Sequence, residues 1–112
     1  MKISKLCEKL SLSLLTDAGY EDREISGCYI GDLLSWVMSN AESGNVWITI
    51  MNNINITAVA SLCDVSCIIL AESVNLPEEV LNKANMAGIT VFSSEKSAYE
   101  LAGMIYCEEK SC

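Results

Sequence analysis

The stretch Val46-Trp47-Ile48-Thr49-Ile50-Met51-Asn52-Asn53-Ile54-Asn55 decides the fold. Apolar and β-branched residues run without interruption from Val46 to Ile50, which is typical of a strand buried on both faces of a sheet. The chain then changes to asparagines, which favour turns. A buried strand that ends in a polar loop before a helix is how an α/β domain presents a site at the carboxyl edge of its sheet. The stretch therefore predicts an α/β fold with polar groups gathered after the strand.

Two later segments repeat this pattern on the C-terminal side. Val65–Leu70 and Ile89–Phe92 are continuous apolar runs of strand length. Between the strands, the spacing of apolar residues predicts a helix over 56–63 and another that Pro77 opens and Gly88 ends. We expect 46–50, 67–70 and 89–92 to be neighbouring interior strands of a parallel sheet.

The N-terminal side adds shorter elements. Helical spacing predicts a helix over Ile3–Leu10, and Leu12–Leu15 resembles a short strand. A polar loop over 16–24 follows, and then a strand over Cys28–Ile30 and a helix that starts at Leu33 and ends near Ser43-Gly44.

Polar residues at the expected helix starts are interpreted as caps. Asp32 precedes the helix at Leu33, Asn55 or Thr57 opens the next one, and Ser94 begins the terminal helix, which continues through Ile105. Asp32 beside Ser35 has the spacing of a base and a nucleophile, but an aspartate three residues before a serine is the ordinary pattern of a helix start.

The predicted architecture is α/β, with a mostly parallel sheet of about five strands and helices on both faces, because short apolar strands alternate with helices. At 112 residues, with 51% hydrophobic residues and one proline, the chain is long and apolar enough for one domain over 1–112. Residues 1–24 would form its helix, strand and polar loop, and 25–112 its strand–helix units.

Charge excludes several classes of partner. Fifteen acidic and seven basic residues give a net charge of −8, which opposes binding to nucleic acid and to anionic membranes. The N-terminus lacks the apolar core of a signal peptide, and no run approaches the roughly 20 apolar residues of a membrane span. We therefore expect a cytoplasmic protein.

The residue types also limit the chemistry. With no histidine there is no Ser-His or Cys-His pair, and no glycine-rich phosphate loop is present, so we expect no catalytic residues and no cofactor. Cys28, Cys63 and Cys67 are interpreted as small buried hydrophobes. The alternative is a metal or iron–sulfur site built from Cys63, Cys67, Cys107 and Cys112, although their spacing matches no CxxC knuckle.

Five segments, spread over nearly the whole chain, carry a family resemblance. They are Tyr29-Ile30-Gly31-Asp32-Leu33-Leu34-Ser35, the strand into Asn52-Asn53-Ile54-Asn55-Ile56, Ile68-Ile69-Leu70, Leu76-Pro77-Glu78-Glu79-Val80 and Ala87-Gly88-Ile89-Thr90-Val91-Phe92. Together they resemble the DRTGG domain family. That family is similar to the N-terminal domain of HPr kinase/phosphorylase, and it occurs as a regulatory module in phosphotransacetylases and CBS-containing pyrophosphatases. It also includes free-standing proteins encoded near iron-hydrogenase genes. The resemblance implies a non-catalytic, dimer-forming regulatory domain that associates with a metabolic or hydrogenase-type enzyme.

The motif that gives the family its name is altered in this chain. Asn52-Asn53 stands where the family has Asp-Arg, and Ala71-Glu72-Ser73 stands where it has Thr-Gly-Gly. Loss of the arginine removes the side chain best suited to bind an anion with two hydrogen bonds, and Glu72 would repel phosphate.

Polar residues after the strands form the predicted site. They should gather in one cleft at the carboxyl edge, where amides and hydroxyls would bind a neutral or weakly polar ligand or a partner's backbone. The alternative is that they only cap helices and satisfy turns. We expect a homodimeric regulatory or interaction module, against the alternative of a cysteine-based metal accessory protein. The predicted ligand-binding residues are Asp32, Ser35, Asn52, Asn53, Asn55, Ser73 and Ser94.

Overall fold

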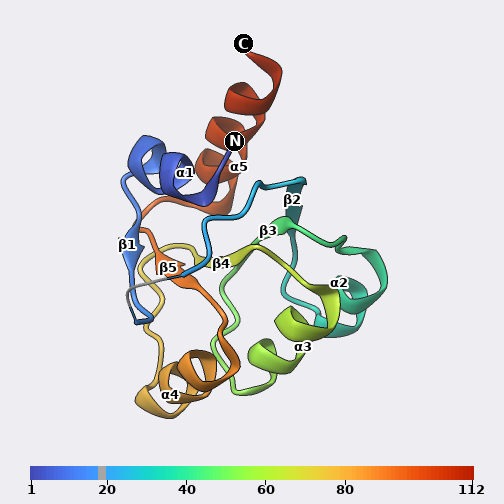
Figure 1. Ribbon diagram of the computed structural model, residues 1–112, viewed down its shortest axis with the longest axis vertical. Coiled ribbons are helices and arrows are strands. Elements are labelled where there is room, and N and C mark those ends of the chain that lie inside the picture. The colour runs from blue at the N-terminus through green and yellow to red at the C-terminus, as the bar shows by residue number, and fades with distance from the viewer. Residues whose placement is uncertain (18–19) are drawn as a thin grey trace.

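The interior strand β3 (Asn45–Thr49) is buried along its whole length, as its apolar run predicts. The computed structural model describes residues 1–17 and 20–112, so Ala18 and Gly19 of the predicted polar loop lie outside the described residues. In the described chain five strands form one sheet in the order β1-β5-β4-β3-β2 (Figure 1).

Four strands of this sheet are parallel. β2 (Gly27–Ile30), β3, β4 (Cys67–Leu70) and β5 (Val91–Ser93) lie side by side in chain order. β1 (Ser13–Leu14) pairs antiparallel with β5 at the edge. The predicted α/β class and mostly parallel sheet of about five strands are therefore confirmed, with β3, β4 and β5 as its interior strands.

Helices cover both faces, also as predicted. Right-handed crossovers between strands added in one direction place their helices on one face, and α2 (Leu34–Asn40), α3 (Asn55–Cys63) and α4 (Glu78–Ala87) share a core there. The terminal helices α1 (Ile3–Leu10) and α5 (Ala98–Lys110) pack together against the other face. Figure 1 shows these two groups on opposite sides of the strands.

The two cores explain why the strand sequences do not alternate between apolar and polar residues. Ile48 and Ile69 lie in the core under α1 and α5, whereas Trp47 and Ile68 lie in the core under the crossover helices. Successive side chains of a strand point to opposite faces, so every position of an interior strand needs an apolar residue.

The strands are shorter than the sequence predicts. Ile50 follows β3 and is 45% exposed, because the sheet ends at Thr49 and the chain turns toward solvent. Val65 and Ile89 are apolar but lie in the connections that lead into β4 and β5. No helix among the described residues has the length and apolar character that crossing a membrane requires.

The predicted N-caps of α2, α3 and α5 are wrong, whereas Gly88 ends α4 as predicted. Leu33, Ile54 and Ser97 are the N-cap residues of α2, α3 and α5. Asp32 instead accepts hydrogen bonds through Oδ1 from the Thr49 hydroxyl at 2.7 Å and the Ile50 amide at 3.0 Å, so it joins the ends of β2 and β3. The helix after it also ends earlier than expected, with Ala41 as its C-cap.

The remaining cap predictions fail for local reasons. Asn55 is the first residue of α3, and the Thr57 hydroxyl donates to the Ile54 carbonyl rather than accepting from an amide. The terminal helix starts three residues after Ser94, at a capping box in which Ser97 and Glu100 exchange hydrogen bonds. A serine at either position can cap a helix, but the reciprocal Glu100 completes a capping box only with the second serine.

Replacing a doubly covered strand residue should prevent folding. Ile69→Asp places an unpaired charge at a fully buried position, which costs several kcal/mol against a total stability of about 5–15 kcal/mol. Circular dichroism should show no cooperative unfolding transition. The matched control is Leu62→Asp on the outside of α3, where Leu62 is 71% exposed, and it should melt within a few degrees of the parent. A cooperative melt of Ile69→Asp near the parent's midpoint would contradict the sheet assignment.

Candidate functional site

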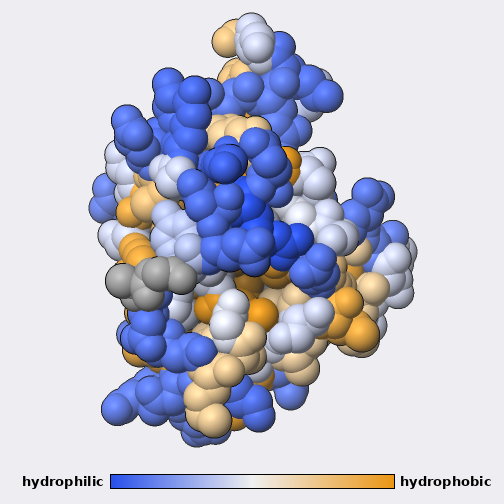
Figure 2. All heavy atoms as spheres, in the orientation of Figure 1, coloured by the Kyte–Doolittle hydropathy of each residue, from blue (hydrophilic) through white to orange (hydrophobic). Residues whose placement is uncertain are grey.

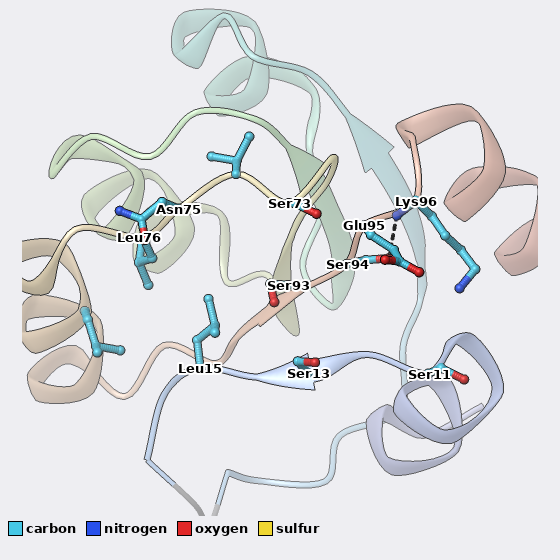
Figure 3. Close-up of a pocket in the computed structure, with 12 residues that line it drawn as sticks. Ser11, Ser13, Leu15, Ser73, Asn75, Leu76, Ser93, Ser94, Glu95 and Lys96 are labelled. Carbon is cyan, nitrogen blue, oxygen red and sulfur yellow. Dashed lines mark hydrogen bonds between the residues drawn. The ribbon is translucent and has the colours of Figure 1, made fainter.

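A cavity of about 580 Å³ lies beside the carboxyl ends of β4 and β5 (Figure 3). Its volume falls in the range of small-molecule sites. We call it the serine pocket, because hydroxyl groups dominate its polar lining. The residues that line it are Ser11, Ser13, Leu15, Ser73, Val74, Asn75, Leu76, Leu81, Ser93, Ser94, Glu95 and Lys96.

The antiparallel pair of β1 and β5 builds one wall. Ser13 is the partner of Ser93 and Leu14 the partner of Phe92 in this pair. Cross-strand partners place their side chains close together on one face, so the two serines adjoin. Leu14 packs in the core under α1 and α5, which leaves Ser13 on the opposite side, toward the pocket.

The connections after β4 and β5 build the second wall and are tied to each other. The Ser73 amide donates to the Ser94 carbonyl at 2.9 Å, and the Glu72 amide donates to the Lys96 carbonyl at 2.9 Å. Within its own loop, the Ser94 hydroxyl accepts from the Lys96 amide at 3.1 Å. These bonds hold the rim of the pocket in one arrangement.

Glu72 and Ser73 both have φ of 57°, in the left-handed region that favours glycine. By the resemblance to the DRTGG family, these are the two positions at which the motif has its glycines. The left-handed turn is therefore formed without the residues that suit it best. Side chains in this region cost free energy that glycine avoids.

Most hydroxyls of the pocket are free. Among the described residues, the side chains of Ser11, Ser13, Ser73 and Ser93 have no hydrogen-bond partner, unlike that of Ser94. Hydroxyls can both donate and accept. The pocket thus offers a row of unpaired groups to a bound molecule.

The charges of the pocket lie at one end. Glu95 is exposed, and the half-buried Lys96 directs Nζ to the Leu10 carbonyl at 3.5 Å, at the C-terminal end of α1. Figure 3 shows Glu95 and Lys96 on one side of Ser13, Ser73 and Ser93, and Leu15 and Leu76 on the other. One end of the pocket is therefore ionic and the other apolar.

The structure brings only part of the predicted site together. Ser73 and Ser94 line the serine pocket, and Asn52 supports its wall, because its Nδ2 donates to the Asn75 carbonyl at 2.7 Å. Asp32 is engaged between β2 and β3 and does not line this pocket.

The other three predicted residues also lie outside the pocket. Asn53 accepts from the Asn55 amide through Oδ1 at 3.0 Å, which is a local turn contact. Asn55 and Ser35 are exposed, and the Ser35 carbonyl accepts from the Ser39 hydroxyl within α2. The predicted cleft thus divides into the serine pocket and a separate group of strand-end and turn contacts near β2 and β3.

Sequence reasoning missed the residues that β1 contributes. Ser11, Ser13 and Leu15 precede the parallel strands by many residues, and nothing local shows that β1 returns to pair with β5. The available signal was the alternation Ser11-Leu12-Ser13-Leu14, in which the leucines pack in the core and the serines are exposed.

The four cysteines of the alternative metal site, Cys63, Cys67, Cys107 and Cys112, do not come together at one point. Cys63 lies in the core under the crossover helices and Cys67 in the opposite core, so the sheet separates their thiols. Burial raises the pKa of the Cys67 thiol to about 12 and, reinforced by Glu109, the pKa of Cys28 to about 12. Cys107 and Cys112 are exposed at the end of α5. Over residues 1–17 and 20–112 no three cysteine or carboxylate side chains are arranged to hold a metal.

Comparison with known proteins confirms the resemblance noted in the sequence. The DRTGG domain model matches residues 5–107. A search of curated protein sequences returned no match. Among solved structures, the fold is similar to the CBS and DRTGG domains of the regulatory region of a Clostridium perfringens pyrophosphatase, complexed with the activator diadenosine tetraphosphate. The TM-score is 0.69 and the identity 14%, over 92% of this chain and 45% of that chain. This chain thus spans less than half the length of that structure.

Restoring glycine in the rim should stabilise the protein. Glu72→Gly and Ser73→Gly each remove a side chain from a residue in the left-handed region. Glycine also gives the unfolded chain more freedom, so the expected net gain in the free energy of unfolding is about 0.5–1 kcal/mol for each variant. Tm should rise by about 2–6 °C for each, measured by calorimetry. Glu42→Gly, in an exposed loop without positive φ, is the control and should lower Tm. An equal loss of stability in all three variants would contradict the strain at the rim.

Proposed function

Because this chain belongs to the DRTGG domain family, we propose that it is a non-catalytic regulatory module that binds a small molecule in the serine pocket. The observation that carries this proposal is the set of four free hydroxyls around a cavity of about 580 Å³. Hydroxyls that have no bond within the described protein can donate to a bound molecule and accept from it, and a cavity of this size is typical of small-molecule sites.

The electrostatics favour a ligand without net charge. Lys96 is the one basic residue of the pocket lining, and it already contacts the Leu10 carbonyl. Glu95 lines the pocket, and Glu72 lies in the rim. Together with the net charge of −8, these carboxylates oppose a polyphosphate such as the activator of the pyrophosphatase.

We further propose that the module is a two-fold homodimer. β2 is an edge strand, so one side of its backbone lacks strand partners. Large apolar side chains are exposed on and beside it, and two of them, Leu33 and Trp36, are 60% and 61% exposed. Figure 2 shows hydrophobic atoms on the α2 side of this face. A second copy would cover the patch Ile30, Leu33, Trp36, Met38 and Ile50.

In this proposal the dimer acts on an enzyme partner in the cytoplasm. Six free cysteines suit a reducing compartment, and the acidic surface does not suit nucleic acid. Ligand binding at the serine pocket would change the tie between the loops after β4 and β5, which is the part of the domain a partner could sense.

A thermal-shift screen tests the ligand site. The panel should contain polyols, nucleosides, amino acids and polyphosphates, because ligand binding to the folded state raises Tm. We expect an uncharged or net-neutral compound to raise the Tm of the parent and of Ser61→Leu, an exposed position outside the serine pocket. Ser13→Leu fills the pocket and should abolish the shift. If no compound raises Tm, or if Ser13→Leu leaves the shift intact, the ligand site is refuted.

Light scattering tests the dimer. The parent should have twice the chain mass at tens of micromolar, where an interface of standard size is saturated. Leu33→Asp combined with Trp36→Asp should give a folded monomer, since both side chains are exposed in the single chain. Met86→Asp is the control, because Met86 is 90% exposed but lies on α4. A monomeric parent, or a double variant that remains dimeric, would refute the proposed interface.

A further inference from the structure

We propose that the serine pocket binds a zwitterion with an apolar tail, of the type of a free aliphatic or aromatic amino acid. This inference rests on the proposed ligand site and names its ligand class. It follows from the division of the pocket into an ionic and an apolar end, which a polyol or a simple anion would not use.

The ionic end presents both signs of charge. Glu95 and Lys96 are adjacent in the chain and both line the pocket. The Glu95 carboxylate can accept from an ammonium group, and the Lys96 ammonium can donate to a carboxylate. Neither is engaged in an ion pair with another described residue, and Lys96 has one long contact, at 3.5 Å to the Leu10 carbonyl.

A zwitterion avoids the repulsion that a singly charged molecule would meet. A carboxylate alone would lie near Glu95, in a protein of net charge −8. An amine alone would lie near Lys96. A molecule that carries both groups satisfies the two side chains and has no net charge of its own, which keeps the overall balance unchanged.

The opposite end of the pocket suits an apolar tail. Leu15 and Leu76 lie at this end (Figure 3), and Val74 and Leu81 also line the pocket. Leu15 is two residues beyond Ser13, a distance of about 7 Å along an extended chain. This leaves room for a side chain of the size of norleucine, methionine or phenylalanine.

The free hydroxyls connect the two ends. Figure 3 shows Ser13, Ser73 and Ser93 between the ionic pair and the leucines. They can donate to the ligand's carboxylate or accept from its ammonium group, which helps fix the head group where the tail begins. The three features occur in the order head, polar link and tail.

Isothermal titration with a homologous series tests the ligand class on the full chain. The probes are α-aminobutyrate, norvaline and norleucine, and we expect each added methylene to tighten binding by up to about fourfold, the equivalent of ~0.8 kcal/mol of apolar burial. Pentylamine and hexanoate each lack one charge of norleucine and should bind at least tenfold more weakly.

Variants assign the two ends. Glu95→Gln and Lys96→Met should each weaken norleucine at least tenfold, while Lys96→Arg should retain most of the affinity, since it keeps the charge. Lys83→Met on the exposed side of α4 is the control and should bind like the parent. Calorimetric melts show that each variant is folded before it is titrated.

The outcomes separate this inference from the proposed function. Binding of norleucine that depends on both charges and on tail length supports it. If a polyol or nucleoside binds and Ser13→Leu blocks it, while no amino acid binds, the ligand site stands and the zwitterion is refuted. If nothing in either panel binds, both are refuted.

Discussion

Burial of β3, β4 and β5 on both faces is the constraint from which the rest of the structure follows. Strands that are covered on both sides need apolar residues at successive positions, and Val46–Ile48 and Cys67–Leu70 supply them. The crossover helices then lie on one face and the terminal helices on the other. Since the parallel strands end at one edge, the loops after β4 and β5 meet there, and their backbone hydrogen bonds complete the rim of a pocket. The fold places the polar groups, and the pairing of β1 selects which of them face a cavity.

The pairing of β1 with β5 forms one wall of the serine pocket. β1 has two residues, yet it brings Ser13 beside Ser93 and continues to Leu15 at the apolar end. The carboxyl ends of β2 and β3 are different, because Asp32 accepts hydrogen bonds from Thr49 and Ile50 and so joins these two ends. The polar groups at the ends of β2 and β3 are thus bonded to one another, whereas the pocket beside the ends of β4 and β5 keeps hydroxyls without a partner among the described residues. This difference is the physical reason why we propose the ligand in the serine pocket rather than at the ends of β2 and β3.

The sequence was sufficient for the fold and insufficient for the site. Continuous apolar runs predicted three neighbouring interior strands and helices on both faces, because a strand that is covered on both faces needs apolar residues at successive positions. The cap of the terminal helix was predicted at Ser94, although Glu100 completes a capping box only with Ser97. The site failed for another reason: Asp32, Asn52, Asn53 and Asn55 follow strands as predicted, but hydrogen bonds to Thr49, Asn75 and local backbone groups engage three of them. Ser11, Ser13 and Leu15 enter the pocket through a long-range antiparallel pair that no local pattern encodes.

The claim that the serine pocket is the ligand site is tested most directly by a map of backbone amide chemical shifts during titration with norleucine. We expect the largest changes in chemical shift at Ser11, Ser13, Ser73 and the segment 93–96, which come from three separate parts of the chain. Amides of β2 and α2 should change little, because the residues there do not line the serine pocket. Saturable changes confined to β2 and α2 would contradict the claim that the serine pocket is the ligand site, and the absence of a saturable change at any residue would contradict the binding of an amino acid there.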